Sequence, residues 1–505
     1  MKKLLIFNIF LFLLIQISFS QDSLRSLNEV VYSIYTSWDE EKLNNKISPK
    51  FLHKDIDSFV ETIEKVGVNP YFNFPKDSFY HDIELLKNRI DTPLTRKEFL
   101  LQFVPVANKL NLSHTKVKPD YWVYENIFNK NGGTYFPINI EIENNSLFVI
   151  KDYSSYHLAE GTEIISISNM KSNTIIDSLR RYSSGTTQNA EIMDVQNDFS
   201  FWLWWVYNVL DTFKVQTPNE LYSIKGMNPD KLDSLEKENT VQQKIHREDD
   251  IPYEYKQLDS TTGKLNFRHF AIRGETANKH FRRFLDSVFL QLRVDSIQNL
   301  IIDVRGNPGG NNSQVEVAKY LYDKPFKTSS KVIYKKSKIA YNFFRLMLYP
   351  EDRNDPEKLK IVNDCFGPCQ SKHSFGESYE CDKEAIHPNP DSIRFDGKLF
   401  VLTDHKTNSS AVDFAVLIKD YNMGKIIGSE TRQSPSNDAN GMYFMLSHSN
   451  VIAEGATQYV VRPNGDPSTQ KGIIPDYKVT QKKEDTEKGI DTVMEFTMKL
   501  IDNKN

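Results

Sequence analysis

The sequence predicts an α/β fold with a mostly parallel sheet, and two strand-turn-helix units carry this prediction. In the first unit, the mostly apolar residues 299–304 lead into a polar turn and a helical pattern. In the second, the run at residues 398–403 leads into a polar turn and a helical pattern at 410–418. Runs of this length and branching are typical of strands buried on both faces. Alternation of such strands with helices favours a parallel sheet.

The turn after the first strand has the sequence Asn-Pro-Gly-Gly and ends at Gly309 and Gly310. Glycine reaches the positive φ angles that such a turn needs, and the turn exposes backbone N–H groups at the start of a helix. N–H groups of this kind bind a phosphate, a carboxylate or the oxyanion of an acyl-transfer intermediate. The turn alone does not choose between these ligands, and an ordinary strand-to-helix turn is an equal alternative.

Ser409 lies where the helix of the second unit begins. At that place the helix dipole and the free N–H groups favour a developing alkoxide, and the N–H of Ser410 points to the same side as the Ser409 hydroxyl. We therefore consider Ser409 a candidate nucleophile. The alternative is that Ser409 only caps the helix.

Together the two motifs resemble the S41 peptidases. The shared pattern is Arg-x-Asn-Pro-Gly-Gly at 305–310, Thr-x-Ser-Ser-Ala at 407–411, Gly-x-x-Thr at 428–431 and Gly-x-x-Pro-Asp at 472–476. The resemblance implies a crotonase/ClpP-like α/β catalytic domain and a serine endopeptidase that hydrolyses peptides or unfolded proteins through an acyl-enzyme, with no cofactor and no metal. It also implies that Ser409 is the nucleophile and that Ser410, Gly309 and Gly310 form the oxyanion hole.

The family has two branches that activate the serine differently. One branch places a lysine where this chain has Ser434, and residues 432–442 contain no lysine. The other branch, which resembles the tricorn core, uses the histidine of an upstream Ser-His pair, and Ser113 and His114 match that pair. The resemblance therefore makes His114 the general base, with Ser113 orienting its ring. A solvated surface histidine is the alternative.

The outer acid of the tricorn-like branch would fall at Thr469, which is not acidic. Asp466 is the nearest substitute, and the alternative for it is a turn residue. A missing acid also suits a catalytically decayed S41-fold protein that binds peptides or apolar ligands. A hydrolase of non-peptide esters would use the same chemistry, because a fold and a nucleophile do not fix the substrate.

The amino terminus, residues 1–20, has the pattern of a signal peptide: Lys2 and Lys3, an apolar run and small residues before Gln21. It predicts a secreted or periplasmic protein with no membrane contact after cleavage, and an uncleaved anchor is the alternative. The formal net charge of −4 argues against a nucleic-acid partner. The expected partner is a peptide or an unfolded protein, and a homo-oligomer is left open.

Three cysteines, Cys365, Cys369 and Cys381, lie close together in one polar stretch. In an oxidising compartment they predict one disulfide and one unpaired thiol, and their spacing is uncommon for zinc, which is the alternative.

The expected domain organisation follows from these patterns. After the signal peptide, residues 21–120 form an N-terminal helical cap that carries the Ser-His motif. Residues 121–250 form a PDZ-like β-rich domain. Its Trp-rich helix at 199–210 is expected to be buried, with a substrate-binding or partner patch as the alternative, and its charged residues 215–250 form a linker or a surface insertion. Residues 251–480 form the catalytic domain with an insertion at 329–392 that could act as a lid, and 481–505 form a C-terminal helix. The PDZ-like reading rests on the resemblance of residues 161–169, and a plain β domain is the alternative.

Overall fold

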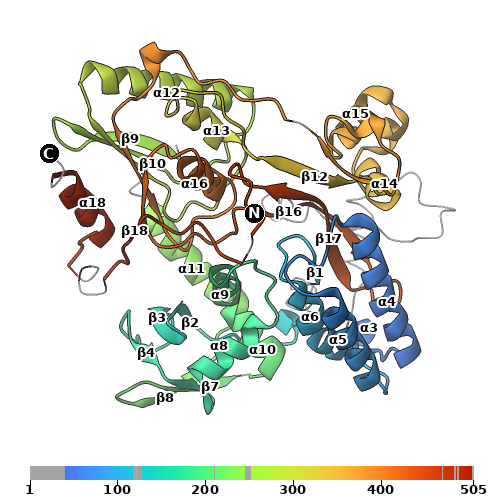
Figure 1. The fold of residues 1–505 in the computed structure, drawn as a ribbon. Coiled ribbons are helices and arrows are strands. Elements are labelled where there is room, and N and C mark those ends of the chain that lie inside the picture. Colours follow the sequence, from blue (N-terminus) through green and yellow to red (C-terminus); the bar gives the residue numbers. More distant parts are fainter. Residues whose placement is uncertain are drawn as a thin grey trace.

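The computed structural model describes residues 40–117, 124, 128–209, 211–244, 252–381, 383–468, 470–482, 485 and 488–502. The expected signal peptide at residues 1–20 and the position of Thr469 lie outside these residues. Figure 1 shows the helices of residues 40–107 packed beside the hairpin of β16 and β17, and the β-rich part beneath the larger sheet.

A sheet of six strands lies at the centre of the second half of the chain (Figure 1). Its order is β18-β15-β14-β11-β10-β9, and every neighbouring pair is parallel except β10 and β9. This confirms the mostly parallel sheet predicted from the sequence. The strands are β9 (Tyr253–Gln257), β10 (Thr262–Phe267), β11 (Asn299–Asp303), β14 (Lys398–Thr403), β15 (Lys425–Gly428) and β18 (Tyr477–Lys478).

Helices cover both faces of this sheet. One face packs against α12 (Glu275–Val294), α13 (Ser313–Ala318) and α16 (Ser410–Asp420). The other face packs against α18 (Thr492–Asp502) through alternate residues of β11 and β14. Every residue of β11 is buried as a result, which is why its central residues 300–302 are all apolar.

A second sheet has the order β1-β17-β12-β13, with β16 paired to β17. The strands are β1 (Lys116–Val117), β12 (Lys331–Lys335), β13 (Ser378–Cys381), β16 (Asn437–Met445) and β17 (Ile452–Val461). The expected insertion at 329–392 thus supplies two strands of a sheet. It also carries α14 (Lys338–Leu346) and α15 (Pro356–Asp364), with the short helices η2 (Pro350–Asn354), η3 (Gln370–Lys372) and η4 (Asp391–Ile393).

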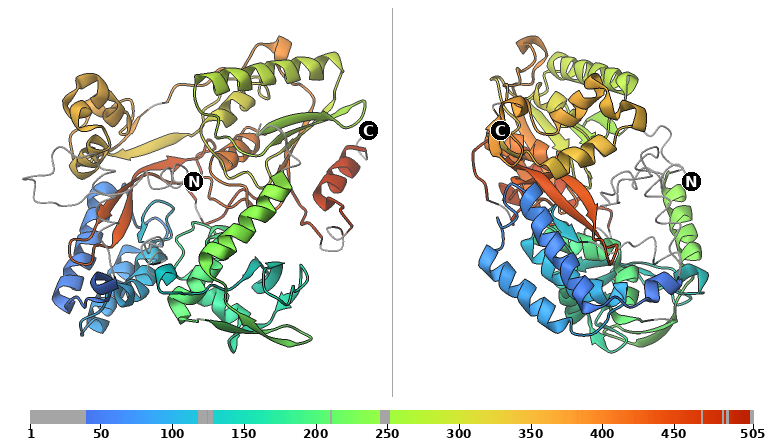
Figure 2. Two further views of the ribbon diagram at one scale, coloured as in Figure 1. Left: turned by 180° about the vertical axis from the view of Figure 1, so that it is seen from behind. Right: turned by 90° about the vertical axis from the view of Figure 1, so that its right-hand side faces the viewer.

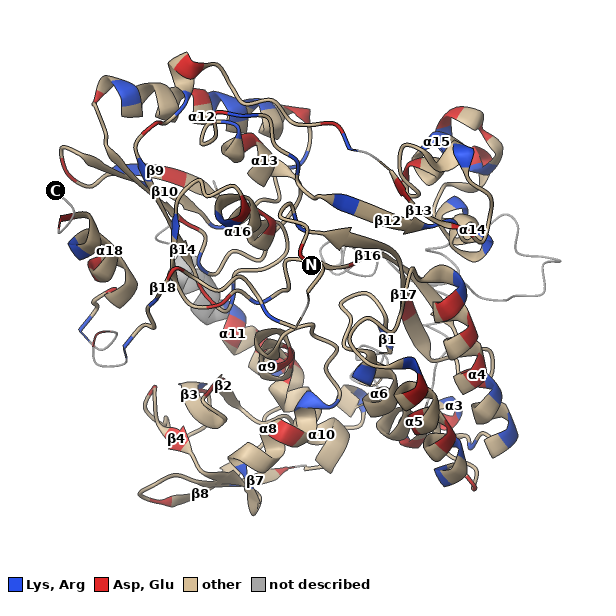
Figure 3. Cartoon of the chain, in the orientation of Figure 1, with Lys and Arg blue, Asp and Glu red and all other residues tan. Residues whose placement is uncertain are grey.

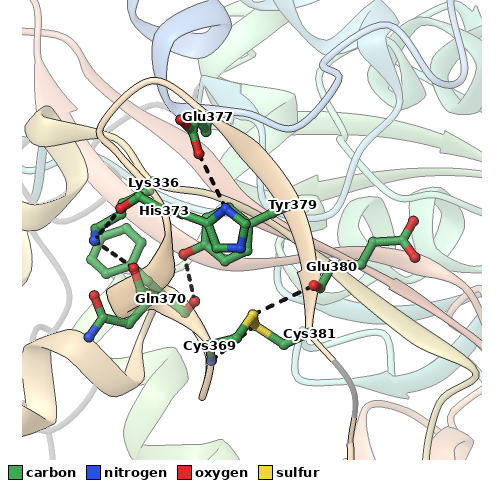
Figure 4. The surroundings of a disulfide bond; sticks show 9 residues. Lys336, Cys369, Gln370, His373, Glu377, Tyr379, Glu380 and Cys381 are labelled. Carbon is green, nitrogen blue, oxygen red and sulfur yellow. Dashed lines mark hydrogen bonds and ion pairs between the residues drawn. A yellow bond between two sulfur atoms is a disulfide. The ribbon is translucent and has the colours of Figure 1, made fainter.

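A disulfide between Cys369 and Cys381 joins the segment after α15 to β13, while Cys365 is a free thiol (Figure 4). This is the predicted combination of one disulfide and one thiol. Beside the disulfide, the ring of His373 stacks on Tyr379 with 3.8 Å between ring centroids. Among the described residues, no group of three or more His, Cys, Asp and Glu side chains is placed to hold a metal ion.

The amino-terminal helices, residues 40–110, bind the turn between β16 and β17 through hydrogen bonds. Asp55 accepts from the backbone N–H groups of His448 at 3.1 Å and Ser449 at 2.6 Å. Arg96 donates to the carbonyl oxygens of Ser449 at 3.0 Å and Asn450 at 2.9 Å. Both side chains are almost fully buried, so a buried polar network fixes these helices on the hairpin. The helices are α3 (Glu40–Asn44), α4 (Pro49–Val66), α5 (Lys76–Arg89), α6 (Arg96–Ala107) and η1 (Asn108–Leu110).

The β-rich part, residues 128–225, holds two small sheets, β2-β3-β4 and β6-β5-β7-β8. Its strands are β2 (Ile138–Glu143), β3 (Ser146–Asp152), β4 (Glu163–Ile164), β5 (Ser166–Ile167), β6 (Met170–Lys171), β7 (Thr212–Gln216) and β8 (Leu221–Lys225). Its helices are α8 (Ser172–Arg180), α9 (Gln188–Asn197) and α10 (Phe199–Tyr207). Helix α10 is the Trp-rich helix, and most of its aromatic residues are buried as predicted. It carries no charged residue, whereas α4, α5, α12 and α15 carry both signs (Figure 3).

Residues 215–250 were expected to form a linker or a surface insertion, and the linker alternative is wrong for most of the residues up to 244. The structure has β7, β8 and the helix α11 (Pro229–Lys244), which extends from the β-rich part toward the large sheet (Figure 2). The Asn228 side chain accepts from the N–H groups of Asp230 at 3.0 Å and Lys231 at 3.2 Å, and Pro229 occupies the first turn. This is an N-terminal cap followed by good helix formers. The helix lacks an apolar stripe, so periodicity could not indicate it.

Candidate active site

The turns after β11 and β14 meet at one edge of the large sheet. Parallel neighbouring strands end at the same edge, so the residues after them lie close together. The Asp404 carboxylate accepts from the N–H of Gly306 at 2.9 Å, and the N–H of Asn408 donates to the carbonyl oxygen of Asn307 at 2.9 Å. A Cβ atom on Gly309 would lie 2.5 Å from the Cβ of Ser409. The two motifs therefore form one compact unit.

Ser409 is exposed and has an unusual backbone conformation, with φ 52° and ψ −128°. Positive φ angles are uncommon for residues with a side chain, and strain of this kind clusters at functional sites. The Ser409 side chain makes no capping hydrogen bond to α16, which argues against the capping alternative. The backbone N–H of Ser409 donates to the side-chain oxygen of Gln433 at 3.1 Å.

Two of the three predicted oxyanion donors are available. Within the part of the chain that the structure describes, the N–H groups of Gly310 and Ser410 donate to no acceptor. The N–H of Gly309 is engaged, because it donates to the side-chain oxygen of Asn307 at 2.8 Å. Gly309 instead allows the close approach to Ser409, at a φ of +96°. Two unengaged donors beside an exposed hydroxyl are what an oxyanion hole requires.

His114 is held by a buried carboxylate that the sequence analysis did not find. Its Nδ1 lies 2.7 Å from Oε1 of Glu454, which is 3% exposed. Burial opposes ionisation of Glu454, but Lys116 and His114 outweigh it and lower its pKa to about 2. An ionised carboxylate only accepts hydrogen bonds, so Nδ1 carries the proton and Nε2 keeps its lone pair. His114 is therefore held in the form that a general base needs.

The loop that carries His114 is fixed by a second carboxylate. Asp438 accepts from the backbone N–H groups of Ser113 at 2.7 Å and His114 at 2.8 Å. Burial raises the pKa of Asp438, although the charge of His114 and these two N–H groups oppose the rise. Ser113 thus contributes a backbone N–H to this loop, and the acceptor for the ring is Glu454.

The structure does not bring Asp466 to the histidine. Its carboxylate accepts from the N–H of Ser468 at 2.9 Å, within the turn that contains both residues. Glu454 lies on β17, opposite Lys116 of β1. A signal for it exists in the sequence, because Glu454 is the only charged residue of the strand Ile452–Val461. A lone acid in a buried strand usually has a partner.

Ser409 and His114 are linked through one short segment, residues 433–438. Gln433 accepts from the backbone of Ser409, and Asp438 accepts from the backbone of His114. No hydrogen bond joins the side chains of Ser409 and His114, both of which are among the described residues. Ser434, at the position where the other branch has its lysine, is fully buried. The segment therefore supports the candidate nucleophile and the candidate base without supplying a base itself.

Helix α9 of the β-rich part braces the start of this segment. The Thr187 hydroxyl donates to the carbonyl oxygen of Arg432, and the Asn189 amide donates to that of Glu430 at 3.1 Å. An ion pair of 2.8 Å joins Arg432 to Asp194. Residues 430–432 thus receive support from the β-rich part, one residue before Gln433.

Comparison with known proteins shows a family match over most of the large sheet and its helices, and a similar fold in solved structures. Residues 262–479 match the model of Peptidase family S41. The solved structure of mature CPAF complexed with lactacystin is 15% identical, covers 90% of this chain and 99% of its own, and superposes with a TM-score of 0.58. A crystal structure of mature CPAF is 14% identical, covers 86% and 94%, and has a TM-score of 0.55. The photosystem II D1 C-terminal processing protease is 13% identical, covers 85% and 93%, and has a TM-score of 0.40.

The strand-turn-helix edge and the family match together define a serine-type peptidase. The matching part, residues 262–479, is an S41 peptidase domain. No curated protein sequence matches it. Among the described residues, no helix is both long enough and apolar enough to span a membrane.

Proposed function

We propose that this protein is an exported serine endopeptidase that hydrolyses peptides or unfolded proteins through an acyl-enzyme on Ser409. The observation that carries the proposal is the contact of His114 with ionised, buried Glu454, which leaves Nε2 free to act as a base. The exposed, strained nucleophile and the two unengaged N–H groups beside it support the same reaction.

The reaction assigns a step to each group. Nε2 of His114 takes the proton of the Ser409 hydroxyl while Oγ bonds to the scissile carbonyl carbon. The N–H groups of Gly310 and Ser410 bind the oxyanion that forms. His114 then gives its proton to the leaving amine as the C–N bond breaks. Water attacks the acyl-enzyme with His114 again as base, which releases the acid and restores Ser409. The first step requires that substrate binding bring Ser409 and His114 within hydrogen-bond reach.

The β-rich part suits a peptide substrate. Strands β2 and β4 are the edges of the small sheet β2-β3-β4. An extended chain that adds to such an edge gains affinity from backbone hydrogen bonds and leaves its side chains loosely specified. The signal peptide pattern at residues 1–20 supports export, where unfolded proteins and chain ends are available substrates.

The alternative is a decayed protein on the same fold that only binds peptides or apolar ligands. Its main support was the absence of an acid at Thr469, and the contact of Glu454 with His114 removes that support. An esterase for non-peptide substrates would use the same serine, histidine, carboxylate and N–H donors. Parallel profiling with peptide and ester libraries separates it from a peptidase.

Covalent labelling tests the proposal. The purified chain is treated with a fluorophosphonate probe and weighed by intact mass spectrometry, and casein cleavage is followed in parallel. We expect one label on the parent and none on Ser409→Ala, with strongly reduced labelling of His114→Ala and loss of casein cleavage in both. A folded parent that takes no label and cuts nothing would overturn the proposal in favour of the binding protein.

A further inference from the structure

Gly441 lies in the middle of strand β16, where glycine is an unfavourable residue. A glycine inside a strand weakens it, because glycine loses more conformational freedom on folding than other residues, and it often marks a place of close approach. The backbone does not require this glycine, since Gly441 does not have a positive φ angle. The neighbouring strand does: a Cβ atom at this position would lie 2.2 Å from Oε1 of Glu454 and 3.0 Å from its Cγ and Cδ.

This oxygen is the one that His114 contacts, because Oε1 of Glu454 lies 2.7 Å from its Nδ1. The strand register explains why one atom meets both residues. Gly441 pairs with Ala456, two positions along β17 from Glu454, and side chains two positions apart share one face of a sheet. His114 precedes β1, which pairs with the opposite edge of β17. The carboxylate of Glu454 therefore lies between the imidazole on one side and the backbone of β16 on the other.

The backbone next to Gly441 is fixed to β17. Asn440 has a φ of 56°, and its side-chain amide donates to the Thr457 hydroxyl at 2.8 Å. That hydroxyl donates in turn to the carbonyl oxygen of Asn440 at 2.9 Å, and Thr457 is fully buried. A methyl group added at Gly441 would therefore displace the carboxylate of Glu454, which is the end of a flexible side chain, and not the strand.

The displacement is large enough to affect the reaction. Ordinary contacts of a Cβ atom are 3.4–4 Å long, so Oε1 would have to move by about 1 Å. Glu454 is 3% exposed, the hydroxyl of Tyr443 bonds to its carboxylate, and Nζ of Lys116 lies 3.3 Å from its Oε2. These neighbours leave the carboxylate few other positions. A misplacement of about 1 Å in an aligned catalytic group can reduce a rate by about 10²-fold.

We propose that Gly441 is a positioning residue, whose missing side chain makes room for the Glu454 oxygen that aligns His114. The assignment rests on the proposed peptidase function. It adds a requirement to the set of serine, histidine and carboxylate, namely a position without a side chain on the strand behind the carboxylate. Gly441 acts through Glu454 and takes no part in the reaction itself.

A double-mutant cycle tests this assignment. The kcat and KM for casein that carries a self-quenched dye are measured with the full-length parent, Gly441→Ala, Glu454→Gln and the double variant. We expect Gly441→Ala to reduce kcat by about 10²-fold and to leave KM within about twofold, because the displaced group aligns the base and does not bind substrate. In the Glu454→Gln background the same substitution should change kcat by less than about twofold, since the carboxylate that it displaces is already absent.

Gly455→Ala is the matched control. Gly455 follows Glu454 on β17, and consecutive residues of a strand point to opposite faces of the sheet. Its added Cβ would lie 2.8 Å from Cγ2 of Val66, away from the carboxylate. The control thus adds the same methyl group to the same hairpin, and we expect it to keep the kcat of the parent. Circular dichroism should show that both glycine variants are folded.

A proton spectrum of the protein labelled with ¹⁵N-histidine detects the contact without relying on activity. An Nδ1 proton that is bonded to a carboxylate is strongly deshielded, and its loss in His114→Ala identifies it. We expect this resonance in the parent and in Gly455→Ala, and we expect it to move upfield or disappear in Gly441→Ala.

The outcomes separate this assignment from the proposed function. A parent that cleaves casein, with the same kcat and the same resonance in Gly441→Ala, overturns the positioning role alone. Equal losses of kcat in the parent and Glu454→Gln backgrounds, or a Gly441→Ala chain that does not fold, overturn it as well, because the methyl group would then act on something other than Glu454. A parent that takes no fluorophosphonate label and cuts no casein overturns the proposed function and with it this assignment.

Discussion

His114 and Glu454 are separated by 340 positions in the sequence, yet Nδ1 of one and Oε1 of the other lie 2.7 Å apart. Two features of the fold produce this contact. Asp55 and Arg96 fix the amino-terminal helices on the turn between β16 and β17, and β1 pairs with β17 so that Lys116 faces Glu454. The base and its carboxylate are thus aligned by backbone pairing, which leaves little freedom to either side chain.

Replacing the carboxylate next to the base should reduce catalysis strongly. In Glu454→Gln the amide can donate to Nδ1, which would favour the tautomer with the proton on Nε2 and remove the lone pair that deprotonates Ser409. We expect kcat to fall by about 10³-fold or more, as in related Ser-His-acid sites. Asp466→Asn is the matched control and should change kcat by less than about twofold, since surface changes rarely matter. Equal losses in both variants would contradict the role of Glu454.

Lys116 should stabilise the fold in a pH-dependent manner. The pKa of Glu454 is lowered from 4.5 to about 2 on folding, so its contribution is full above pH 4.5 and is lost as the pH falls toward 2. Lys116→Met removes one cause of this lowering, the charge at 3.3 Å. We expect the free energy of unfolding to fall by about 2 kcal/mol at pH 7. Urea unfolding at pH 7 and at pH 3 measures the difference, and an equal loss at both values would argue for packing instead of charge.

Gly309→Ala should disable the nucleophile by contact. The added methyl group would lie 2.5 Å from the Ser409 Cβ and 3.0 Å from the Ser410 nitrogen, so the serine and one oxyanion donor must shift. Gly465→Ala is a matched control, because Gly465 has a similar φ of +86° and no heavy atom within 4 Å of the added Cβ. Both variants should lose about 1–2 kcal/mol of stability from the positive φ. Only Gly309→Ala should have a lower kcat than the parent. Equal kcat values for the two variants would contradict the argument from the close approach of Gly309 to Ser409.

The disulfide should stabilise the insertion, while the free thiol should not. Cys369 and Cys381 are 12 positions apart, and a closed loop of this size contributes about 3 kcal/mol. We therefore expect the double variant Cys369→Ser with Cys381→Ser to melt at a lower temperature than the parent in a thermal scan.

The free thiol should behave differently. Burial raises the pKa of Cys365, so this thiol should react slowly with iodoacetamide at neutral pH. The Cys365→Ser variant should have the same melting temperature as the parent. A larger effect of Cys365→Ser would reverse the assignment.

Local patterns predicted the parts of the fold that are made from neighbouring residues. The strand Lys398–Thr403 was expected at the same bounds, and Ser409 was expected at the start of the helix that follows it. Both predictions depend on apolar periodicity and on turn chemistry within a few residues. Helix α11 was not predicted because its sequence lacks an apolar face.

Contacts between distant residues could not be predicted in the same manner. Asp438 is an ordinary acid in the sequence, and the lone charge of Glu454 in its strand does not indicate which residue it contacts. Only the pairing of β17 with β1 and β16 places both acids at His114. The sequence analysis looked for the outer acid at Thr469 and Asp466 because it had only motif spacing to use. Spacing cannot show which strand pairs with the segment that carries the histidine. Ser409 could be recognised as the candidate nucleophile because its motif consists of neighbouring residues.

The pairing of β1 with β17 also sets the time at which the enzyme can first act. Ribosomes make His114 and Ser409 well before they make Glu454, and β1 has no strand to pair with until β17 has been made. A nascent chain therefore holds its nucleophile and its histidine without the carboxylate that orients them. If the chain degrades unfolded proteins as proposed, this order of synthesis would keep it from attacking its own unfinished copies.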